Sequence, residues 1–127
     1  MADTELRVLV VDDEEGMRQL VRRCLADGCH VVDASSGAEA LALVADGCAI
    51  DVLVTDEMMP EMEGHELARR FRAQNPDLKV LYLTGYADRL FDAKDQMWES
   101  EAYLEKPFTR DGLRQAIAQV VFGRQTL

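Results

Sequence analysis

Short apolar runs rich in β-branched residues alternate along this chain with segments of helical periodicity. The runs are Leu6–Val11, Val31–Val32, Ile50–Thr55, Val80–Leu83 and Tyr103–Leu104. Strands that are apolar on both faces and alternate with helices indicate a parallel sheet that is covered on both sides. Because crossovers between parallel strands are right-handed, we expect a doubly wound α/β fold. Its five strands would run in the order 2-1-3-4-5, with five helices divided between both faces.

The segments between the runs carry helix boundary patterns as well as apolar stripes. Ser36 and Glu39 have the S-x-x-E spacing of a capping box, which predicts the start of a helix. Thr109 is expected to cap the last helix, since its hydroxyl can accept a hydrogen bond from the first turn. A weaker helical pattern falls around Leu90 to Trp98.

Length and charge limit the possible functions. The 127 residues fit one domain over 1–127, with a core at about 6–122. The net charge is 14 − 24 = −10, which argues against binding of nucleic acid or an anionic membrane by charge alone. No apolar run approaches the roughly 18 residues of a membrane span. Three cysteines without a C-x-x-C pattern suit a reducing cytoplasm.

Polar residues follow four of the five expected strands. Asp12 and Asp13 follow the first strand, Asp56 the third, Thr84 the fourth and Lys106 the fifth. Since the carboxyl ends of parallel strands meet at one sheet edge, these groups should converge there. Neighbouring carboxylates repel unless a cation neutralises them, and oxygen ligands suit Mg²⁺. A metal, an ammonium, a hydroxyl and a free carboxylate oxygen are what phosphoryl transfer needs, with Asp56 as the nucleophile.

An acidic pair alone would be weak support, because the chain has 24 acidic residues in 127. The weight comes from four motifs together, and these resemble the receiver domain of two-component response regulators. The likeness runs from Leu6 to about Phe122. The motifs are Val10-Val11-Asp12-Asp13-Glu14, Thr55-Asp56-Glu57-Met58-Met59-Pro60 with Gly64, Leu83-Thr84-Gly85-Tyr86, and Tyr103-Leu104-Glu105-Lys106-Pro107-Phe108.

This resemblance implies a phosphoacceptor and a metal site. Asp56 would take a phosphoryl group from the phosphohistidine of a sensor histidine kinase or a histidine phosphotransfer protein. Asp13 and Asp56 would bind Mg²⁺ directly, together with the backbone carbonyl of Met58, while Asp12 would act through a metal-bound water. Phosphorylation and dephosphorylation would be self-catalysed, so the domain would be a substrate and timer rather than an enzyme.

The resemblance also implies a phosphate pocket and a switch. Lys106 would pair with the phosphoryl group, Thr84 would hydrogen-bond it, and Tyr103 would turn inward as Thr84 moves. The face formed by the fourth helix, the fifth strand and the fifth helix would shift in response. In many receivers the bond that follows the lysine is cis. The residues expected at the pocket rim are Met58, Gly85, Tyr86 and Pro107.

Several residues depart from the family pattern or suggest other chemistry. Glu57 replaces the apolar residue that commonly follows the phosphoacceptor, and its charge either points away or disfavours phosphate. His65 begins a helix but lacks the second histidine of a zinc motif, so a solvated side chain is expected. Arg69, Arg70 and Arg72 are expected on a solvated helix face.

Other functions compete with a phosphorylation switch. An aspartyl-phosphate phosphohydrolase would need a D-x-D nucleophile motif after the first strand. A flavin binder would need a phosphate loop there that is rich in glycine and hydroxyl groups. A receiver that acts only as a protein-binding module typically loses an acid, the hydroxyl or the lysine, and all of these are present. A stand-alone receiver and the C-terminal receiver of a hybrid histidine kinase both remain open.

Overall fold

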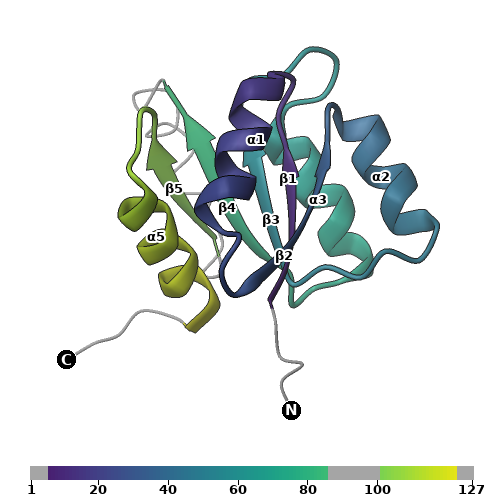
Figure 1. The fold of residues 1–127 in the computed structure, drawn as a ribbon. Coiled ribbons are helices and arrows are strands. Elements are labelled where there is room, and N and C mark those ends of the chain that lie inside the picture. Colours follow the sequence, from purple (N-terminus) through teal and green to yellow (C-terminus); the bar gives the residue numbers. More distant parts are fainter. Residues whose placement is uncertain (1–5, 86–100, 123–127) are drawn as a thin grey trace.

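A computed structural model of the chain describes residues 6–85 and 101–122. It has a central parallel sheet in the order β2-β1-β3-β4-β5, which confirms the predicted fold and strand order (Figure 1). The second strand is longer than the predicted pair of valines, and the third begins at Val52 rather than Ile50. The strands are β1 (Leu6–Val11), β2 (Cys29–Ala34), β3 (Val52–Asp56), β4 (Lys79–Thr84) and β5 (Glu101–Glu105).

Helices cover both faces of this sheet. The helices α1 and α5 lie on one face, and α2 and α3 lie on the other (Figure 1). The helix expected around Leu90 to Trp98 lies outside the described residues. The described helices are α1 (Glu15–Cys24), α2 (Gly37–Ala45), α3 (Gly64–Gln74) and α5 (Arg110–Phe122).

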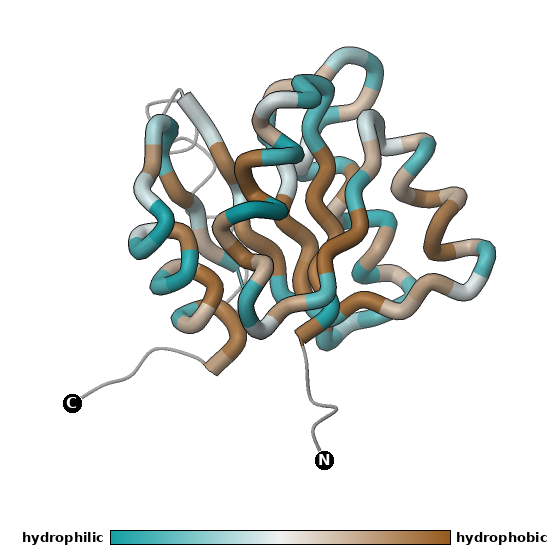
Figure 2. The backbone as a smooth tube through the Cα atoms, in the orientation of Figure 1, coloured by the Kyte–Doolittle hydropathy of each residue, from teal (hydrophilic) through white to brown (hydrophobic). Residues whose placement is uncertain are grey.

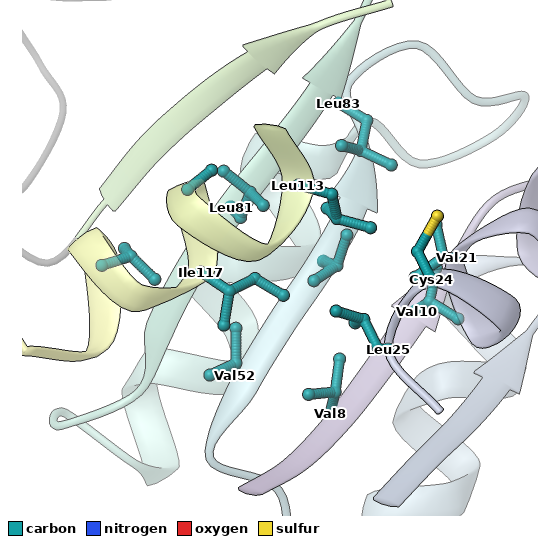
Figure 3. Packing of buried hydrophobic residues seen from close by; sticks show 13 residues of the cluster. Val8, Val10, Val21, Cys24, Leu25, Val52, Leu81, Leu83, Leu113 and Ile117 are labelled. Atoms are coloured by element: carbon teal, nitrogen blue, oxygen red, sulfur yellow. The ribbon is translucent and has the colours of Figure 1, made fainter. Parts of the chain in front are cut away.

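Two apolar clusters form the core, one on each face of the sheet. On β1, Val8 packs toward α1 and α5, whereas Leu9 packs toward α2 and α3, as the alternation of strand side chains requires. Figure 3 shows Leu81 of β4 beside Leu113 and Ile117 of α5. The apolar residues gather on the strands in the middle of the molecule (Figure 2). Strands buried on both faces explain why the apolar runs are nearly continuous.

Both predicted helix caps are present, one with an altered partner. The Ser36 hydroxyl accepts a hydrogen bond from the Glu39 N–H at 3.1 Å, but the Glu39 carboxylate accepts from the N–H and hydroxyl of Ser35. The Thr109 hydroxyl accepts from the Gly112 N–H at 2.9 Å. The caps therefore fix the starts of α2 and α5.

Candidate functional site

The carboxyl ends of β1 and β3 bring three aspartates together. Asp12 and Asp13 follow β1 directly, and Asp56 is the last residue of β3. One carboxylate oxygen from each of the three lies within 4.8 Å of the others. Asp12 is fully buried and Asp56 is 8% exposed, while Asp13 is exposed. The adjacent parallel pairing of β1 and β3 thus produces the acidic cluster that the sequence predicts.

Lys106 faces this cluster from the end of β5. Its Nζ lies 3.4 Å from Oδ2 of Asp12 and 3.7 Å from Oδ1 of Asp56. The Lys106 N–H donates to the carbonyl of Thr84 at 2.7 Å, which ties the two strand ends together. The bond between Lys106 and Pro107 is cis. A single ammonium therefore contacts two of the three carboxylates.

The buried acids resist ionisation. Burial raises the pKa of Asp56 to about 6; the Lys106 ammonium opposes this rise, while Asp12 adds to it. Burial also raises the pKa of Asp12, against hydrogen bonding by the Glu14 N–H and the charge of Lys106. Both pKa values are raised mainly because the acids are removed from water, and the one ammonium nearby offsets only part of that cost. A divalent cation would favour their ionised forms.

An arginine side chain that the sequence analysis did not single out holds the loop after β1. Arg18 of α1 donates from Nη1 to the carbonyl of Asp12 at 2.7 Å and from Nε to Asp33 at 2.9 Å. The Glu14 N–H donates to Oδ1 of Asp12 at 2.9 Å. Arg18 lies one helical turn beyond the acidic loop, and that spacing could have predicted its contact with the loop. Both oxygens of Asp12 have partners, since Lys106 contacts the second.

The loop after β3 depends on a glycine. The Met58 N–H donates to Oδ1 of Asp56 at 3.3 Å, and the Gly64 N–H donates to the carbonyl of Glu57 at 3.1 Å. A Cβ atom at Gly64 would lie 2.5 Å from the backbone carbonyl oxygen of Asp56, closer than atoms tolerate. The start of α3 therefore packs directly against the backbone of the expected phosphoacceptor.

The other predicted site residues occupy different positions around this edge. Thr84 is buried at the end of β4, and the exposed Gly85 follows it with open space where a Cβ would be. Tyr103 is half-buried on β5, opposite Tyr82 of β4. Tyr86 lies outside the described residues. The structure thus brings Asp12, Asp13, Asp56 and Lys106 into one group and places Thr84 at the adjoining strand end.

Two predictions about α3 were wrong. His65 is only partly exposed: 28% of its side chain is accessible, its ring stacks on Tyr82, and its Nδ1 pairs with the Glu57 carboxylate. Arg72 is only 5% exposed and pairs with Glu101. Charged residues were expected on solvated surfaces, but acids supplied by other elements pair with both of these bases on the covered face of α3. The Glu57 carboxylate pairs with His65 on the α3 side of the sheet, in agreement with the expectation that its charge points away.

A doubly wound sheet whose carboxyl edge carries three acids and a lysine defines a class of α/β domain with an acidic pocket whose oxygen donors suit a divalent cation. A sequence model of the response regulator receiver domain matches residues 8–118. The chain belongs to the response regulator receiver family. Receiver domains are phosphoacceptor signalling domains of two-component systems, and they bind Mg²⁺ at the acidic pocket.

Relatives of different lengths contain a region that is similar to this chain. The chain is 34% identical to the sensor kinase CckA of Brucella abortus over 90% of its own length, but it covers only 12% of that kinase. It is 35% identical to the response regulator receiver protein CpdR of the same organism, covering 80% of this chain and 85% of CpdR. The response regulator MprA of Mycobacterium sp. (strain KMS) is 38% identical, and the chain covers 47% of it. The chain therefore spans well under two thirds of CckA and MprA.

Solved structures agree with the family assignment. A response regulator receiver protein from Sinorhizobium medicae has a TM-score of 0.84 and 31% identity, covering 96% of this chain and 98% of that one. The chemotaxis protein CheY4 of Vibrio cholerae has a TM-score of 0.80 and 32% identity, with coverages of 92% and 99%. Among the described residues, no helix is long and apolar enough to cross a membrane.

Proposed function

We propose that this domain is a phosphoacceptor switch in which Asp56 receives a phosphoryl group. The observation that carries the proposal is the convergence of Asp12, Asp13 and Asp56, with the Lys106 ammonium 3.7 Å from Asp56. Asp56 combines near-complete burial with a position at the end of a central strand. That placement suits a nucleophile that a donor approaches from the carboxyl edge of the sheet.

The acidic cluster fits Mg²⁺ by the chemistry of its donors. Asp13 and Asp56 would hold the ion, together with the Met58 carbonyl, because hard oxygen ligands are those that Mg²⁺ prefers. Asp12 would act through a water. Its two carboxylate oxygens already accept hydrogen bonds from the Glu14 N–H and from Lys106, which supports this indirect role. When bound, Mg²⁺ supplies charge neutralisation to the phosphoryl oxygens.

The chain's own residues would act on the phosphoryl group as follows. A carboxylate oxygen of Asp56 forms the new O–P bond while the P–N bond to the donor imidazole breaks. The imidazole keeps the electron pair of that bond. Lys106 pairs with the phosphoryl oxygens, and the Thr84 hydroxyl donates a hydrogen bond to one of them. Hydrolysis of the resulting aspartyl phosphate resets the switch.

The readout would pass through β4 and β5. Thr84 lies at the end of β4, and the Lys106 N–H donates to its carbonyl. Tyr103 is half-buried on the neighbouring strand, opposite Tyr82 of β4. Movement of Thr84 toward the phosphate would make room for Tyr103, and the surface formed by β5 and α5 would change shape.

The phosphodonor is proposed to be a histidine kinase or a histidine phosphotransfer protein. The likeness to CckA favours a receiver taken from a hybrid kinase, and the likeness to CpdR favours a stand-alone receiver. A receiver that only binds protein is the alternative function. It is disfavoured because the acids, the hydroxyl and the lysine all stand at the same sheet edge.

The test is intact-mass spectrometry after incubation with acetyl phosphate, with and without Mg²⁺. We expect the mass of one phosphoryl group to be added in the presence of Mg²⁺, and nothing to be added to Asp56→Ala. Lys106→Ala should acquire the group more slowly than the parent. A protein-binding module would acquire none under any of these conditions.

A further inference from the structure

Acidic and basic side chains alternate on the α3 face of the sheet. Two bases, His65 and Arg72, lie seven residues apart on α3 and therefore share one helix face. Two acids approach them, Glu57 from the end of β3 and Glu101 from the start of β5. Tyr82 of β4 lies between these pairs. The set spans three neighbouring strands below a single helix.

The contacts in this set are specific. Oε2 of Glu57 pairs with Nδ1 of His65, and the His65 ring stacks on Tyr82 with centroids 4.6 Å apart. The Tyr82 hydroxyl donates to Oε2 of Glu101 at 3.3 Å, and Nε of Arg72 lies 3.3 Å from the same oxygen. The Glu57 side chain is 11% exposed. With His65 protonated, the four charges sum to zero.

Glu57 carries a charge that matters for the acceptor site. It directly follows Asp56, the last residue of β3, and lies in the bend after that strand. Its carboxylate lies on the α3 side of the sheet, where it pairs with His65. In the part of the chain that the structure describes, His65 is the cation in contact with it. The pKa of His65 is raised, first by its hydrogen bond to Glu57, which favours the charged pair.

We propose that His65 is a positioning residue that holds and neutralises the Glu57 carboxylate, so that a fourth negative charge does not act on the phosphoacceptor site. The inference rests on the proposed function of Asp56. It explains how this chain accommodates a glutamate at the position where its family commonly has an apolar residue. The stack on Tyr82 and the contact of Tyr82 with Glu101 hold the His65 ring in place.

The proposal predicts opposite changes in two measurements on H65Q at pH 7. An uncompensated Glu57 charge attracts a dication and repels an anion. We therefore expect Mg²⁺ to bind at least about threefold tighter, as measured by backbone amide shifts in an NMR titration. Phosphorylation by acetyl phosphate at saturating Mg²⁺ should slow by at least about threefold. A side chain that served only to hold the structure would weaken Mg²⁺ binding and slow phosphorylation together.

Further variants isolate the charge and provide controls. E57Q and E57Q/H65Q lack the carboxylate, and both should return the Mg²⁺ affinity and the rate to within about twofold of the parent. H65K keeps a cation and should behave like the parent. H30Q removes the chain's other histidine, which is exposed on β2, and should change neither measurement. H65N supplies a second uncharged replacement if H65Q does not fold.

The outcome decides the proposal independently of the phosphorylation switch. Mg²⁺ binding that is unchanged or weaker in H65Q, or a tightening that persists in E57Q/H65Q, overturns it. If the parent protein acquires no phosphoryl group at all, the proposed function fails, while the Mg²⁺ titration still tests the role of His65. Tighter Mg²⁺ binding in H65Q alone, together with slower phosphorylation, supports both.

Discussion

The Asp56 carboxylate lies where ionisation is difficult, although the proposed nucleophilic attack requires its ionised form. The residue is 8% exposed, and its pKa is raised to about 6, chiefly by burial. Lys106 offsets part of this cost, and Asp12 adds to it. At neutral pH the metal-free site therefore holds an anion that destabilises the fold. This is the expected behaviour of a site that is completed by a cation.

The first prediction concerns Asp56→Asn without metal. A carboxyl whose native pKa lies above its unfolded value of 3.8 binds protons more tightly when folded, so stability falls as pH rises from about 4 to 6. Asparagine does not ionise, so the stability of Asp56→Asn should not fall in this way. It should raise the free energy of unfolding by about 3 kcal/mol at pH 7 and by about 1 kcal/mol at pH 4.5. Urea unfolding in EDTA measures both values, and equal stability of the two proteins at pH 7 would contradict the prediction.

The second prediction concerns Gly64, whose missing side chain lets α3 contact the Asp56 backbone. A Cβ there would lie 2.5 Å from the Asp56 carbonyl oxygen, so Gly64→Ala should destabilise the domain by about 1–3 kcal/mol. Gly16→Ala on α1 is the matched control, because a Cβ at Gly16 meets nothing within 4 Å. Alanine favours a helix, so the control should be neutral or stabilising. Thermal unfolding compares the two; equal effects would argue against the close contact.

At the scale of elements, α3 is tied to β5 by the buried pair of Arg72 and Glu101. Their side chains are 3% and 4% exposed. Removing one partner of such a pair leaves an uncompensated charge in the interior, which costs far more than the pair itself contributes. The junction between α3 and β5 should therefore be sensitive to single substitutions and tolerant of matched double ones.

The third prediction is that Arg72→Met destabilises the domain by about 3 kcal/mol or more, measured by urea unfolding. The double variant Arg72→Met/Glu101→Leu should recover most of this loss. Arg70→Met provides the control, since Arg70 pairs with Glu66 on the exposed face of the same helix. It should cost about 0.5 kcal/mol or less. A double variant no more stable than Arg72→Met would show that the charge is not the cause.

Elements with one clear signal were predictable from the sequence, and elements with two competing signals were not. Thr109 stands where a cap is needed, and it caps α5 as expected. His65 and Arg72 carry charges that predict solvent, yet their seven-residue spacing also places them on one face. Which signal prevails depends on two acids that are not part of α3. Glu57 follows β3 and pairs with His65, and Glu101 begins β5 and pairs with Arg72. A sequence pattern does not show that pairing until the strand order is known.

At the scale of the whole molecule, the strand order creates the site. Asp12, Asp56 and Lys106 are separated by some forty to fifty positions, yet the order β2-β1-β3-β4-β5 brings them to one edge. This was predictable because polar residues end or directly follow four of the five strands, all at the same edge. The hydrogen bonds from Arg18 to Asp12 and Asp33 were not predicted, and neither was the close approach of Gly64 to the Asp56 backbone. Both depend on distances that the sequence does not show.

The fourth prediction is that Mg²⁺ stabilises the folded domain. A ligand that binds only the native state at tenfold its dissociation constant adds about 1.4 kcal/mol to the free energy of unfolding. Asp13→Ala should lose most of this gain because it removes a proposed ligand. Asp27→Ala, which removes an exposed acid paired with Arg110, should keep it. Urea unfolding across a Mg²⁺ series measures the effect, and an equal gain in Asp13→Ala would remove Asp13 from the ligand set.

The most direct test of the central claim is to locate the phosphorylated residue. Borohydride reduces an aspartyl phosphate to homoserine, and peptide mass spectrometry then identifies the position. After incubation with Mg²⁺ and acetyl phosphate, we predict homoserine at position 56 and at no other acid of the cluster. Reduction at Asp12 or Asp13, or none in a protein that has gained a phosphoryl group, would contradict the account.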